Sequence, residues 1–555
     1  MEHPALFMGW LRGYQRPWIR SDVVAGITAS AIVLPKSLAY ATVAGLPIQV
    51  GLYTAFVPML VYAVVGTSRP LSVSTTTTLG MLTGAALAQA VPDGDPLALA
   101  AATAMLCLLT GAMLMGAAAL RLGFIANFIS APVLTGFKAG VAVVIVVDQL
   151  PKLLGLHMAK SGFLHDAWAI VSAMPDASLA TAGLGVATIL LLLVLEQVIP
   201  KAPAPLIAVA AGILCMPLLH LSTHGVSVVG HVPTGLPSLV LPALSQASLL
   251  WPAAAGIALM SFTESIAAGR AFVLPGESLP RPDRELWATG LANLVSAPFG
   301  CMPSGGGTSQ TAVNRMSGAR TQLAGLVTSL VALATMLLLA PFIGMMPNTT
   351  LAAIVIVYSI GLFKPSDFKA IRAIRRTEFW WSVAALCGVV LLGTLRGILV
   401  AIVVSLMSLS YQALNPALHV LRRKPGTVLF RPVSEHHPDD EATPGLLVLR
   451  PEGRLFFGNA EHLGQRIQPL LADEQPRVVV LDMSAVFDIE YTALVALIDA
   501  EEKQRMAGVE IWLAGLSPAV LDTIRKSRLH DALGEQRMFY SVSDAFAAWL
   551  DRQPS

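Results

Sequence analysis

Long apolar stretches, separated by short polar or basic segments, occupy most of the chain up to about residue 415. A helix that spans a bilayer needs about 20 mostly apolar residues, and fourteen apolar stretches, some of them shorter than this, are candidates. We expect membrane spans near 23–45, 48–66, 72–90, 97–119, 122–150, 180–199, 204–220, 249–269, 285–300, 304–314, 322–345, 349–363, 379–395 and 397–415. Within this pattern the stretch 122–150 looks broken, and the segmentation between 122 and 235 is the least sharply defined.

Basic residues between these stretches predict the side of the membrane on which each loop lies, because cytoplasmic loops collect Lys and Arg. With the N-terminus inside, one alternating path through fourteen spans places all basic loops inside, and both termini are then cytoplasmic. The apolar stretch after the basic N-terminus is too long for the h-region of a cleavable signal peptide. The basic residues placed inside are Arg121, Arg270, Arg281, Arg284, Arg315, Arg320, Lys364, Lys369, Arg372, Arg375, Arg376, Arg422, Arg423 and Lys424.

The composition changes sharply near the end of the last apolar stretch. The whole chain is 55% hydrophobic and 13% charged, against about 25% charged residues in soluble proteins. Residues 1–425 contain 24 Lys and Arg against 14 Asp and Glu, whereas residues 426–555 contain 12 against 20. A basic membrane part followed by an acidic soluble part accounts for the small net charge. We expect a cytoplasmic N-terminus (1–21), a membrane transport domain (22–421), a linker (422–443) and a cytoplasmic domain (444–555).

The soluble part alternates short apolar runs with amphipathic segments, as strands and helices do. This order suggests a small open sheet faced by helices. The stretch Lys424–Thr443, with two His and two Asp residues, is interpreted as a polar linker. We expect strands at 446–449, 455–457, 478–481 and 510–514, and helices at 460–471, 492–506 and 518–526.

Two segments inside the membrane region are poor candidates for continuous helices. Ser68–Thr78 starts with polar residues and Pro and then contains a run of Thr, and Gly300–Ser309 contains Pro303 and three consecutive glycines. Backbone that is not helical at membrane depth must be buried in protein or line a polar cavity. Each segment follows an ionisable intramembrane residue, Lys36 or Glu264, at a similar interval, which weakly indicates a two-fold internal repeat. Paired interruptions in corresponding halves point to the binding site of a transporter.

Motifs for catalysis and cofactor binding are missing from the sequence. No Walker A loop, zinc-ligand spacing or nucleophile elbow occurs. The four cysteines lie in or beside apolar segments, so we interpret them as core residues rather than disulfides or metal ligands; they are Cys107, Cys215, Cys301 and Cys387. The sequence therefore predicts neither an enzyme nor a cofactor, a metal site or a nucleic-acid partner.

Four ordered motifs give the chain a specific resemblance to the SulP family of anion transporters. They are residues 34–57, then Gly66–Ser74, then Glu264–Phe272 with Glu285–Asn293, and finally Ser309–Asn314. In the soluble part, Val478–Ser484 resembles the strand-to-loop signature of the STAS domain that this family carries. The resemblance extends over nearly the whole chain.

The resemblance implies an α-helical polytopic membrane protein with fourteen spans in two inverted repeats of seven, two half-helices, and a C-terminal α/β STAS domain. It also implies a homodimer in the bilayer of a bacterial inner membrane and elevator-like movement of a core subdomain against a gate. Family substrates include sulfate, bicarbonate, chloride and dicarboxylates, and we expect secondary active transport of sulfate or bicarbonate. An uncoupled anion channel or exchanger and a dicarboxylate carrier stay open as alternatives. A nucleobase permease shares the fold, but the STAS domain disfavours it.

In the family, two half-helices meet N-terminus to N-terminus near the middle of the membrane, and here they would begin near Ser74–Thr76 and Gly305–Thr308. A helix N-terminus carries about half a positive charge and several free N–H donors, so two facing ends can hold an anion. Glycines let the backbone approach a ligand closely, and the hydroxyls of Ser72 and Ser309 can add donors. The expected anion-binding residues are Lys36, Ser74, Thr75, Thr76, Gly305, Gly306, Gly307, Thr308 and Gln310.

Simpler interpretations of these two segments exist. The glycine run could be a flexible linker, although it lies between two apolar spans. Each Thr hydroxyl in the first segment could bond back to the carbonyls of its own helix. In both cases the residues would be structural and would not contact an anion.

Lys36 departs from the family pattern, which has Gln at this place and tends to have Arg where Gln310 stands. Lys36 lies roughly 20 Å along a helix from Asp22, and a Lys at the centre of a bilayer costs about 2.5–3.5 kcal/mol on insertion scales. We interpret it as the cation of the anion site, moved from the second half-helix to the first span. The alternative is a structural ion pair with Glu264.

Glu264 is the candidate coupling residue, because a family carboxylate at this place is associated with coupling to H⁺ or Na⁺. Thr263 and Ser265 could help to hold Na⁺, but a sodium site needs several more oxygens that the sequence does not identify, so we favour H⁺ and leave Na⁺ open. In the STAS loop, Glu490 and Tyr491 stand where the family usually has Asp and Ser. Phosphorylation of that Ser is therefore not expected here, and a scaffold role for the domain stays open beside a regulatory one.

Overall fold

The structure is a computed structural model that describes residues 8–11, 13–127, 130–156, 158, 163–199 and 202–552. Its contacts divide the chain into two units, Met1–Leu406 and Met407–Ser555. The first unit is helical, and the second is built around a β-sheet. This agrees with the expected combination of a helical membrane protein and an α/β domain.

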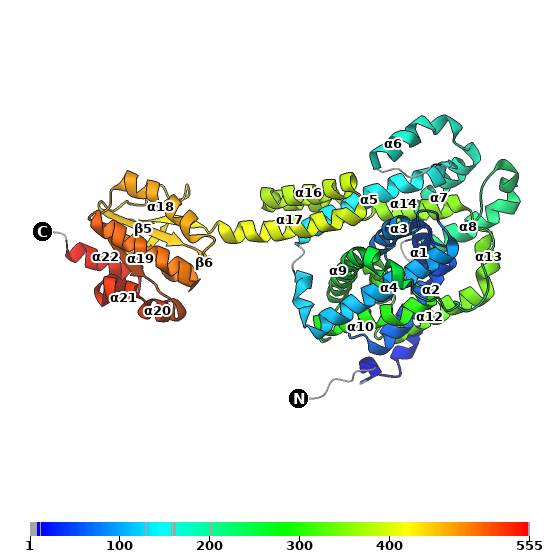
Figure 1. Cartoon of the computed structure of the whole chain (residues 1–555), viewed down its shortest axis with the longest axis horizontal. Coiled ribbons are helices and arrows are strands. Elements are labelled where there is room, and N and C mark those ends of the chain that lie inside the picture. The colour runs from blue at the N-terminus through cyan, green and yellow to red at the C-terminus, as the bar shows by residue number, and fades with distance from the viewer. Residues whose placement is uncertain are drawn as a thin grey trace. The chain divides into compact units, whose positions relative to one another are not determined.

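A helix overlaps each of the fourteen intervals that were expected to span a membrane (Figure 1). By length and composition, seven helices among the described residues could cross a membrane, and three shorter apolar helices accompany them. The number of spans therefore stays a prediction. The helices are α1 Trp18–Val43, α2 Gln49–Val65, α3 Thr77–Ala90, α4 Pro96–Ala119, α5 Ala131–Leu154, α6 Phe163–Ser172, α7 Leu179–Val198, α8 Ala204–Leu218, α9 Ala247–Ala271, α10 Pro282–Ser296, α11 Thr308–Met316, α12 Leu323–Ala334, α13 Ala340–Gly344, α14 Asn348–Ile360, α15 Pro365–Ile374, α16 Arg376–Leu392 and α17 Thr394–Leu414.

Two irregularities in the helical unit have local causes. The expected break in the segment 122–150 is present, because a 3₁₀ helix at Leu122–Asn127 precedes α5, and Pro132 opens the new helix. Residues 128 and 129 lie outside the described residues. A π-helical turn, Thr335–Leu339, joins α12 to α13, where Pro341 interrupts the hydrogen-bond ladder.

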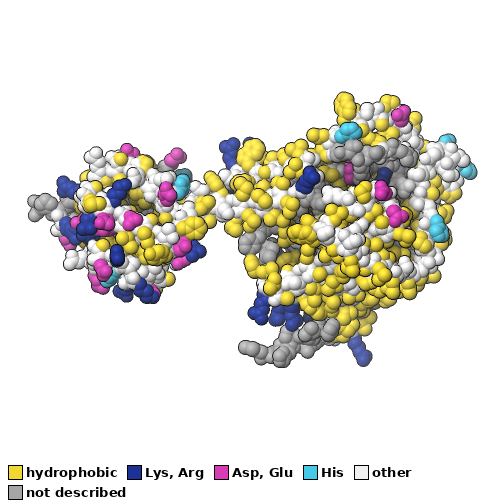
Figure 2. Space-filling model, in the orientation of Figure 1, with side chains coloured by type: hydrophobic (Ala, Val, Ile, Leu, Met, Phe, Trp, Pro, Cys, Tyr) yellow, Lys and Arg dark blue, Asp and Glu magenta, His cyan; other side chains and the backbone are white. Residues whose placement is uncertain are grey.

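The surface of the helical unit is largely apolar, whereas charged side chains gather on the second unit (Figure 2). Leu97 and Leu179 are 82% and 89% exposed, and many other large apolar side chains are exposed with them. An exposed apolar surface of this extent needs an apolar environment. It fits a unit that is surrounded by lipid.

The second unit contains a six-stranded sheet in the order β10-β9-β7-β5-β3-β4, with parallel pairing from β10 to β5 and antiparallel pairing at β3 and β4. Alternate residues of the strands face opposite sides, and α22 packs on one face while α18 to α21 pack on the other. The strands are β3 Leu418–Arg423, β4 Phe430–Pro432, β5 Leu446–Pro451, β7 Val478–Asp482, β9 Glu510–Ala514 and β10 Met538–Phe539, and a separate parallel pair joins β6 Gly453–Leu455 to β8 Val486–Ile489. The helices are α18 Ala460–Glu474, α19 Tyr491–Met506, α20 Pro518–Arg525, α21 Arg528–Leu533 and α22 Val542–Asp551.

The sheet begins before the expected cytoplasmic domain, because β3 starts at Leu418, inside the range expected for the membrane transport domain, and β4 lies in the stretch interpreted as a polar linker. β3 pairs with β5 through residues 418–421, and β4 extends the same sheet beyond β3. The hydropathy pattern missed both strands because their side chains are mostly half-buried and basic residues interrupt the apolar run. Phe456 and Phe457, which were expected in a strand, lie in the turn after β6 instead.

Buried carboxylates in the second unit are paired with arginines. Both oxygens of Asp440 accept hydrogen bonds of 2.7 Å from Arg431, and these bonds hold the pKa of the Asp440 carboxyl below its usual range. Asp482, at the end of β7, accepts a bond of 2.7 Å from Arg450. Pairing with an arginine compensates the cost of removing each carboxylate from water.

Candidate functional site

Two short extended arms meet in the interior of the helical unit, each directly before a helix. β1 Val73–Ser74 precedes α3, and β2 Gly305–Gly306 precedes α11. The arms pair antiparallel, with Val73 opposite Gly306 and Ser74 opposite Gly305. The segments predicted to be interrupted are therefore non-helical, and their polar backbone is satisfied by mutual pairing within protein.

The first half-helix, α3, starts one to three residues later than expected and has a side-chain cap. Thr76 is its N-cap, and the Thr76 Oγ1 atom accepts the N–H of Leu79 at 3.3 Å. Among the described residues, no acceptor bonds the N–H groups of Thr77 and Thr78. The Thr75 hydroxyl is buried and also has no partner in the described part of the chain.

The second half-helix, α11, has no side-chain cap, because its N-cap residue is Gly307. The first bond that closes its ladder runs from the N–H of Thr311 to the carbonyl of Gly307. Within the described ranges, the N–H groups of Thr308, Ser309 and Gln310 have no acceptor. This end therefore presents more free donors than the end of α3.

The three glycines have a packing reason that the sequence did not reveal. A Cβ atom at Gly305 would lie 2.8 Å from the Ser261 hydroxyl, and one at Gly306 would lie 2.8 Å from the Cα atom of Ser265. Both serines belong to α9, so the glycines allow the second arm to lie against that helix. A Cβ atom at Gly307 would meet the side chain of Gln310 at 3.0 Å.

The side chain of Gln310, at the start of α11, holds the two arms together through hydrogen bonds. Its Oε1 atom accepts the hydroxyls of Ser74 at 2.8 Å and Ser72 at 3.3 Å. Its Nε2 atom donates to the carbonyl of Thr75 at 3.2 Å. The side chain amide is therefore engaged on both ends by the first arm, and only 2% of the residue is exposed.

A cavity of about 510 Å³ opens in front of the two helix N-termini. It extends to the exposed residues Lys364 and Asp367 at the start of α15. Lys138 of α5 adds a second cation to its wall. The polar residues of its inner part are Tyr40, Thr76, Thr77, Thr78, Glu264, Thr308, Ser309 and Gln310.

Glu264 of α9 lies at the N-terminus of the first half-helix. One of its carboxyl oxygens accepts the Thr76 hydroxyl at 2.8 Å, and the residue lines the cavity. Only 6% of Glu264 is exposed. Among the described residues, no ion pair joins it to Lys36 or to another basic side chain, so the structure lacks the ion pair that was the alternative interpretation of Lys36.

Lys36 of α1 lies at the second half-helix instead. Its Nζ atom donates to the Ser309 hydroxyl at 3.4 Å and lies 3.7 Å from the centre of the Tyr358 ring. The residue is 3% exposed and sits behind the wall that Ser309 contributes to the cavity. An ammonium at this place adds to the positive end of the α11 dipole.

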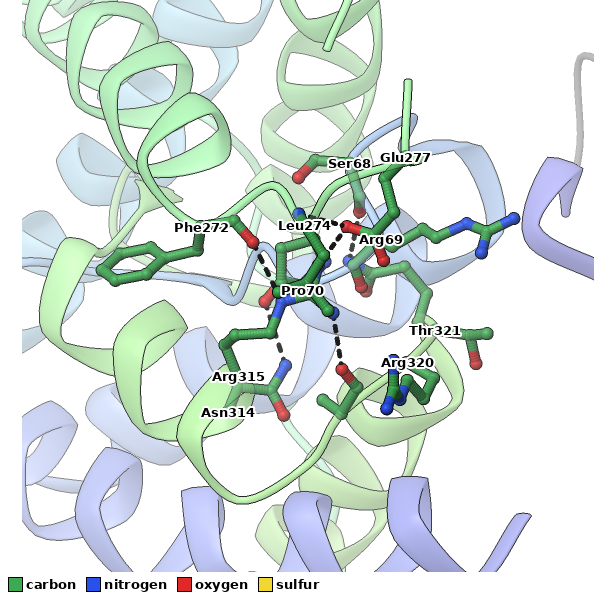
Figure 3. A network of polar contacts seen from close by, with 12 residues as sticks. Ser68, Arg69, Pro70, Phe272, Leu274, Glu277, Asn314, Arg315, Arg320 and Thr321 are labelled. Carbon is green, nitrogen blue, oxygen red and sulfur yellow. Dashed lines mark hydrogen bonds and ion pairs between the residues drawn. The ribbon is translucent and has the colours of Figure 1, made fainter. Parts of the chain in front are cut away.

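Polar contacts fix the far end of the second half-helix and the approach to the first arm (Figure 3). Arg315 of α11 forms an ion pair with Glu277 and donates to the carbonyl of Phe272 at 2.9 Å. Asn314 donates to the carbonyl of Pro70 at 3.0 Å, directly before the first arm. The loop after α9 thus anchors the far end of α11, and α11 in turn holds the chain directly before the first arm.

The same network reaches the start of α1. Gln322 donates to the carbonyls of Ser68 and Leu71 at 2.7 and 2.8 Å. Asp22 accepts the N–H of Arg320 at 2.6 Å and the hydroxyl of Thr321 at 2.6 Å.

Glu285 is held in the same way, by the hydroxyl of Tyr62 at 2.7 Å and by Thr67. These carboxylates use hydroxyl and N–H donors rather than basic side chains.

The structure brings the predicted site residues to one place, but only some of them line the cavity. Thr76, Gly307, Thr308, Gln310 and Glu264 do so, and behind them lie Lys36, Ser74, Thr75, Gly305 and Gly306. Sequence reasoning missed Tyr40, Thr77, Thr78 and Lys138. Tyr40 could have been found, because it lies four residues after Lys36 on the same helix face, and Lys138 is an ionisable residue inside an expected span.

No group of three or more His, Cys, Asp and Glu side chains that could hold a metal ion occurs among the described residues. The cysteines described by the structure are free, and Cys107 and Cys301 are buried. The chemistry of the site therefore rests on N–H groups, hydroxyls, one carboxylate and nearby ammonium groups.

Comparison with known proteins identifies two matching family models. The model of the sulfate permease family matches residues 19–385, and that of the STAS domain matches residues 437–545. A relative named "Probable sulfate transporter" from Mycobacterium tuberculosis is 31% identical over 98% of this chain and 99% of its own length. "High affinity sulfate transporter 2" of Stylosanthes hamata is 29% identical over 97% of this chain and 85% of its own length. These relatives are named as transporters rather than enzymes.

Solved structures share the fold at lower identity. The murine solute carrier 26 family member A9, an anion transporter solved in its inward-facing state, has a TM-score of 0.87 at 20% identity, over 98% of this chain and 94% of that one. The transmembrane domain of the cyanobacterial bicarbonate transporter BicA has a TM-score of 0.61 at 22% identity, over 71% of this chain and 98% of that one.

Proposed function

Because this chain belongs to the sulfate permease family of membrane-spanning anion transporters and carries a C-terminal STAS domain, we propose that it is a secondary active carrier of a small inorganic anion. The proposed substrate is sulfate or bicarbonate, and the proposed driving ion is H⁺. The protein would work in the inner membrane of a bacterial cell. The relatives named as sulfate transporters and the likeness to a bicarbonate transporter support this choice of anions.

The observation that carries the proposal is that one cavity contains both half-helix N-termini and the Glu264 carboxyl group. The uncapped N–H groups of α11 suit an oxyanion. An ionised Glu264 in the same cavity would repel that anion, since the effective dielectric constant inside protein is far below that of water. Protonation of Glu264 removes the repulsion, so anion and proton favour each other's binding, as symport requires.

Transport also needs access from both sides of the membrane. The cavity reaches Lys364 and Asp367, which the distribution of basic residues assigns to the cytoplasmic side. We propose that movement of the helices that carry the two arms, in the manner of an elevator, exposes the same site to the other side. We also propose that the protein is a homodimer, as the family resemblance implies.

The test is an uptake panel with the purified protein in proteoliposomes. Labelled sulfate, bicarbonate, chloride and succinate are offered with and without inward H⁺ and Na⁺ gradients. We expect saturable uptake of sulfate or bicarbonate that is accelerated by a proton gradient. Uptake that does not saturate, or that does not depend on a proton gradient, would favour the channel or exchanger alternative. A preference for succinate over the inorganic anions would favour the dicarboxylate carrier.

The proposed orientation places both termini in the cytoplasm. Reporter fusions at Ser555 and near Asn348 should report opposite sides of the membrane, because Asn348 begins α14 on the proposed outer side. Reporters that are equally accessible from one side would contradict this topology. Cross-linking of the purified protein in lipid would test the dimer.

We propose that the STAS domain acts mainly as a scaffold. Tyr491 is 78% exposed and is the first residue of α19, where the family usually has a phosphorylatable Ser. Deletion of residues 440–555 should reduce folding or uptake, because it removes most of the second unit, whereas Tyr491→Phe should change little. A large, kinase-dependent loss in Tyr491→Phe would show that a hydroxyl switch exists.

A further inference from the structure

The buried ammonium group of Lys36 needs groups that stabilise its charge, and the two that contact it are a hydroxyl and an aromatic ring. A hydrogen bond from nitrogen to oxygen is best near 2.9 Å, so its contact of 3.4 Å with the Ser309 hydroxyl is weak. In the described part of the chain, no carboxylate forms an ion pair with it. The closest strong partner is the face of the Tyr358 ring, whose centre lies 3.7 Å away.

Tyr358 is in turn connected to an acidic residue. It belongs to α14, and its hydroxyl interacts electrostatically with the carboxylate of Glu196 on α7. Glu196 is also the charged group with which Lys36 interacts electrostatically. The helices α1, α14 and α7 lie side by side, so the three residues form a chain across three elements (Figure 1).

We propose that Tyr358 and Glu196 are positioning residues that hold the Lys36 ammonium at the N-terminus of α11 for anion binding. This inference rests on the proposed function of the cavity as an anion site. A cation above an aromatic face is attracted by the negative charge of the ring face, and the attraction is stronger when the cation is removed from water. The negative charge of Glu196 near the Tyr358 hydroxyl polarises the ring and strengthens this attraction.

The arrangement solves a problem that a direct ion pair would create. A carboxylate in contact with Lys36 would neutralise its charge and occupy its N–H donors, so little would remain to attract an anion. The ring stabilises the ammonium through its face and leaves N–H donors available. Glu196 lowers the cost of burying the charge from a distance, through the ring, without competing for the anion.

The test is a variant series at Tyr358 with Lys36→Gln as the second arm of a double-mutant cycle. The KM for the anion that the parent takes up in the panel should rise about 10-fold in Tyr358→Leu, since the ring face is lost. It should rise only about 2- to 3-fold in Tyr358→Phe and in Glu196→Gln, because both keep the face and lose only its polarisation. Maximal uptake should change less than KM in all three.

Non-additivity separates positioning from simple packing. In the Lys36→Gln background, Tyr358→Leu should cause no further rise in KM, because the cation that it positions is absent. Tyr53→Leu in α2 is the matched control, since it also truncates a half-buried tyrosine of the helical unit, and it should leave KM near the parent value. Equal KM values for the parent and Tyr358→Leu would overturn the proposal.

A second measurement does not depend on transport. The melting temperatures of the parent, Lys36→Gln, Tyr358→Leu and the double variant should be non-additive if the ring stabilises the ammonium. Additive shifts would overturn the proposed contact even if the protein carries anions. If the shifts are non-additive but the parent takes up no anion in the panel, the contact stands, and both the proposed function and the positioning role that rests on it are overturned.

Discussion

The two half-helices of the helical unit present unequal N-termini to the same cavity. α3 begins at a Thr76 cap whose hydroxyl accepts the N–H of Leu79 and donates to Glu264, so a hydroxyl and a carboxyl group occupy that end. α11 begins after Gly307, which offers no cap, and the Lys36 ammonium contacts Ser309 in its first turn. One end therefore meets an acidic group, and the other meets a basic group.

This difference between the two helix N-termini shows how two similar elements can have different functions. Both helix ends attract negative charge through their free N–H groups. At α3 that capacity is partly used by residues of the protein, whereas at α11 it stays open and is reinforced by a cation. We therefore expect the transported anion to bind nearer to α11 and the coupling proton to bind at Glu264, beside α3.

The largest effect is expected from Lys36→Gln, which removes the cation from the second end. Anion affinity should fall roughly 10- to 100-fold, because a hydrogen bond to a charged group contributes about 1.5–3 kcal/mol. Isothermal titration with the transported anion measures this loss. An affinity equal to that of the parent would mean that Lys36 is not part of the site.

The double variant Lys36→Gln with Gln310→Arg sharpens the same comparison. It returns a cation to the place where the family usually has Arg, so part of the lost affinity should return. Arg cannot accept the hydroxyls of Ser72 and Ser74 that Gln310 accepts now. The melting temperature should therefore fall below that of Lys36→Gln alone, and an unchanged affinity would contradict the idea of a relocated charge.

Glu264→Gln alters the first end and should act on coupling more than on affinity. The neutral amide mimics the protonated carboxyl group, so anion binding should persist while the stimulation of uptake by a proton gradient is lost. Initial uptake rates at several external pH values measure this effect. A variant that keeps the full acid stimulation would exclude Glu264 as the coupling residue.

Gly307→Ser would make the second end resemble the first. The new hydroxyl can accept an N–H in the first turn of α11, as Thr76 does at α3, and would compete with the anion for that donor. We expect a loss of affinity of about 3- to 10-fold, in line with about 1 kcal/mol for a cap. Gly307→Ala is the control, because a Cβ alone already meets the Gln310 side chain at 3.0 Å.

The smallest effect is expected from Ser309→Ala. The contact between its hydroxyl and Lys36 is 3.4 Å long, which is longer than a good hydrogen bond. Affinity should therefore change by less than about 3-fold, as for a weak neutral partner. A loss as large as that of Lys36→Gln would show that the hydroxyl, rather than the ammonium, contacts the anion.

The sequence predicted the helices, the two interrupted segments and the family, because each of these leaves a signal in hydropathy or in an ordered motif. It also predicted that Lys36 and Glu264 lie near the two arms. It could not show that Gly305 and Gly306 serve packing against α9, since that depends on a helix about forty residues away in the chain. The hydrogen bonds from Gln310 to the first arm and the contact of Lys36 with the Tyr358 ring join residues even more distant in sequence. Lys138 reaches the cavity wall from yet another helix.

The pairing of the two arms has a consequence for biosynthesis. The N–H of Ser72 bonds to the hydroxyl of Thr311, which is 239 positions later in the chain. While the ribosome is still translating the first half, the first arm has no partner for its polar backbone, and such groups are costly in lipid. We expect α3 to stay beside the translocon or an insertase until α11 emerges, so a chain that stops before the second arm should be degraded rather than inserted as a stable half.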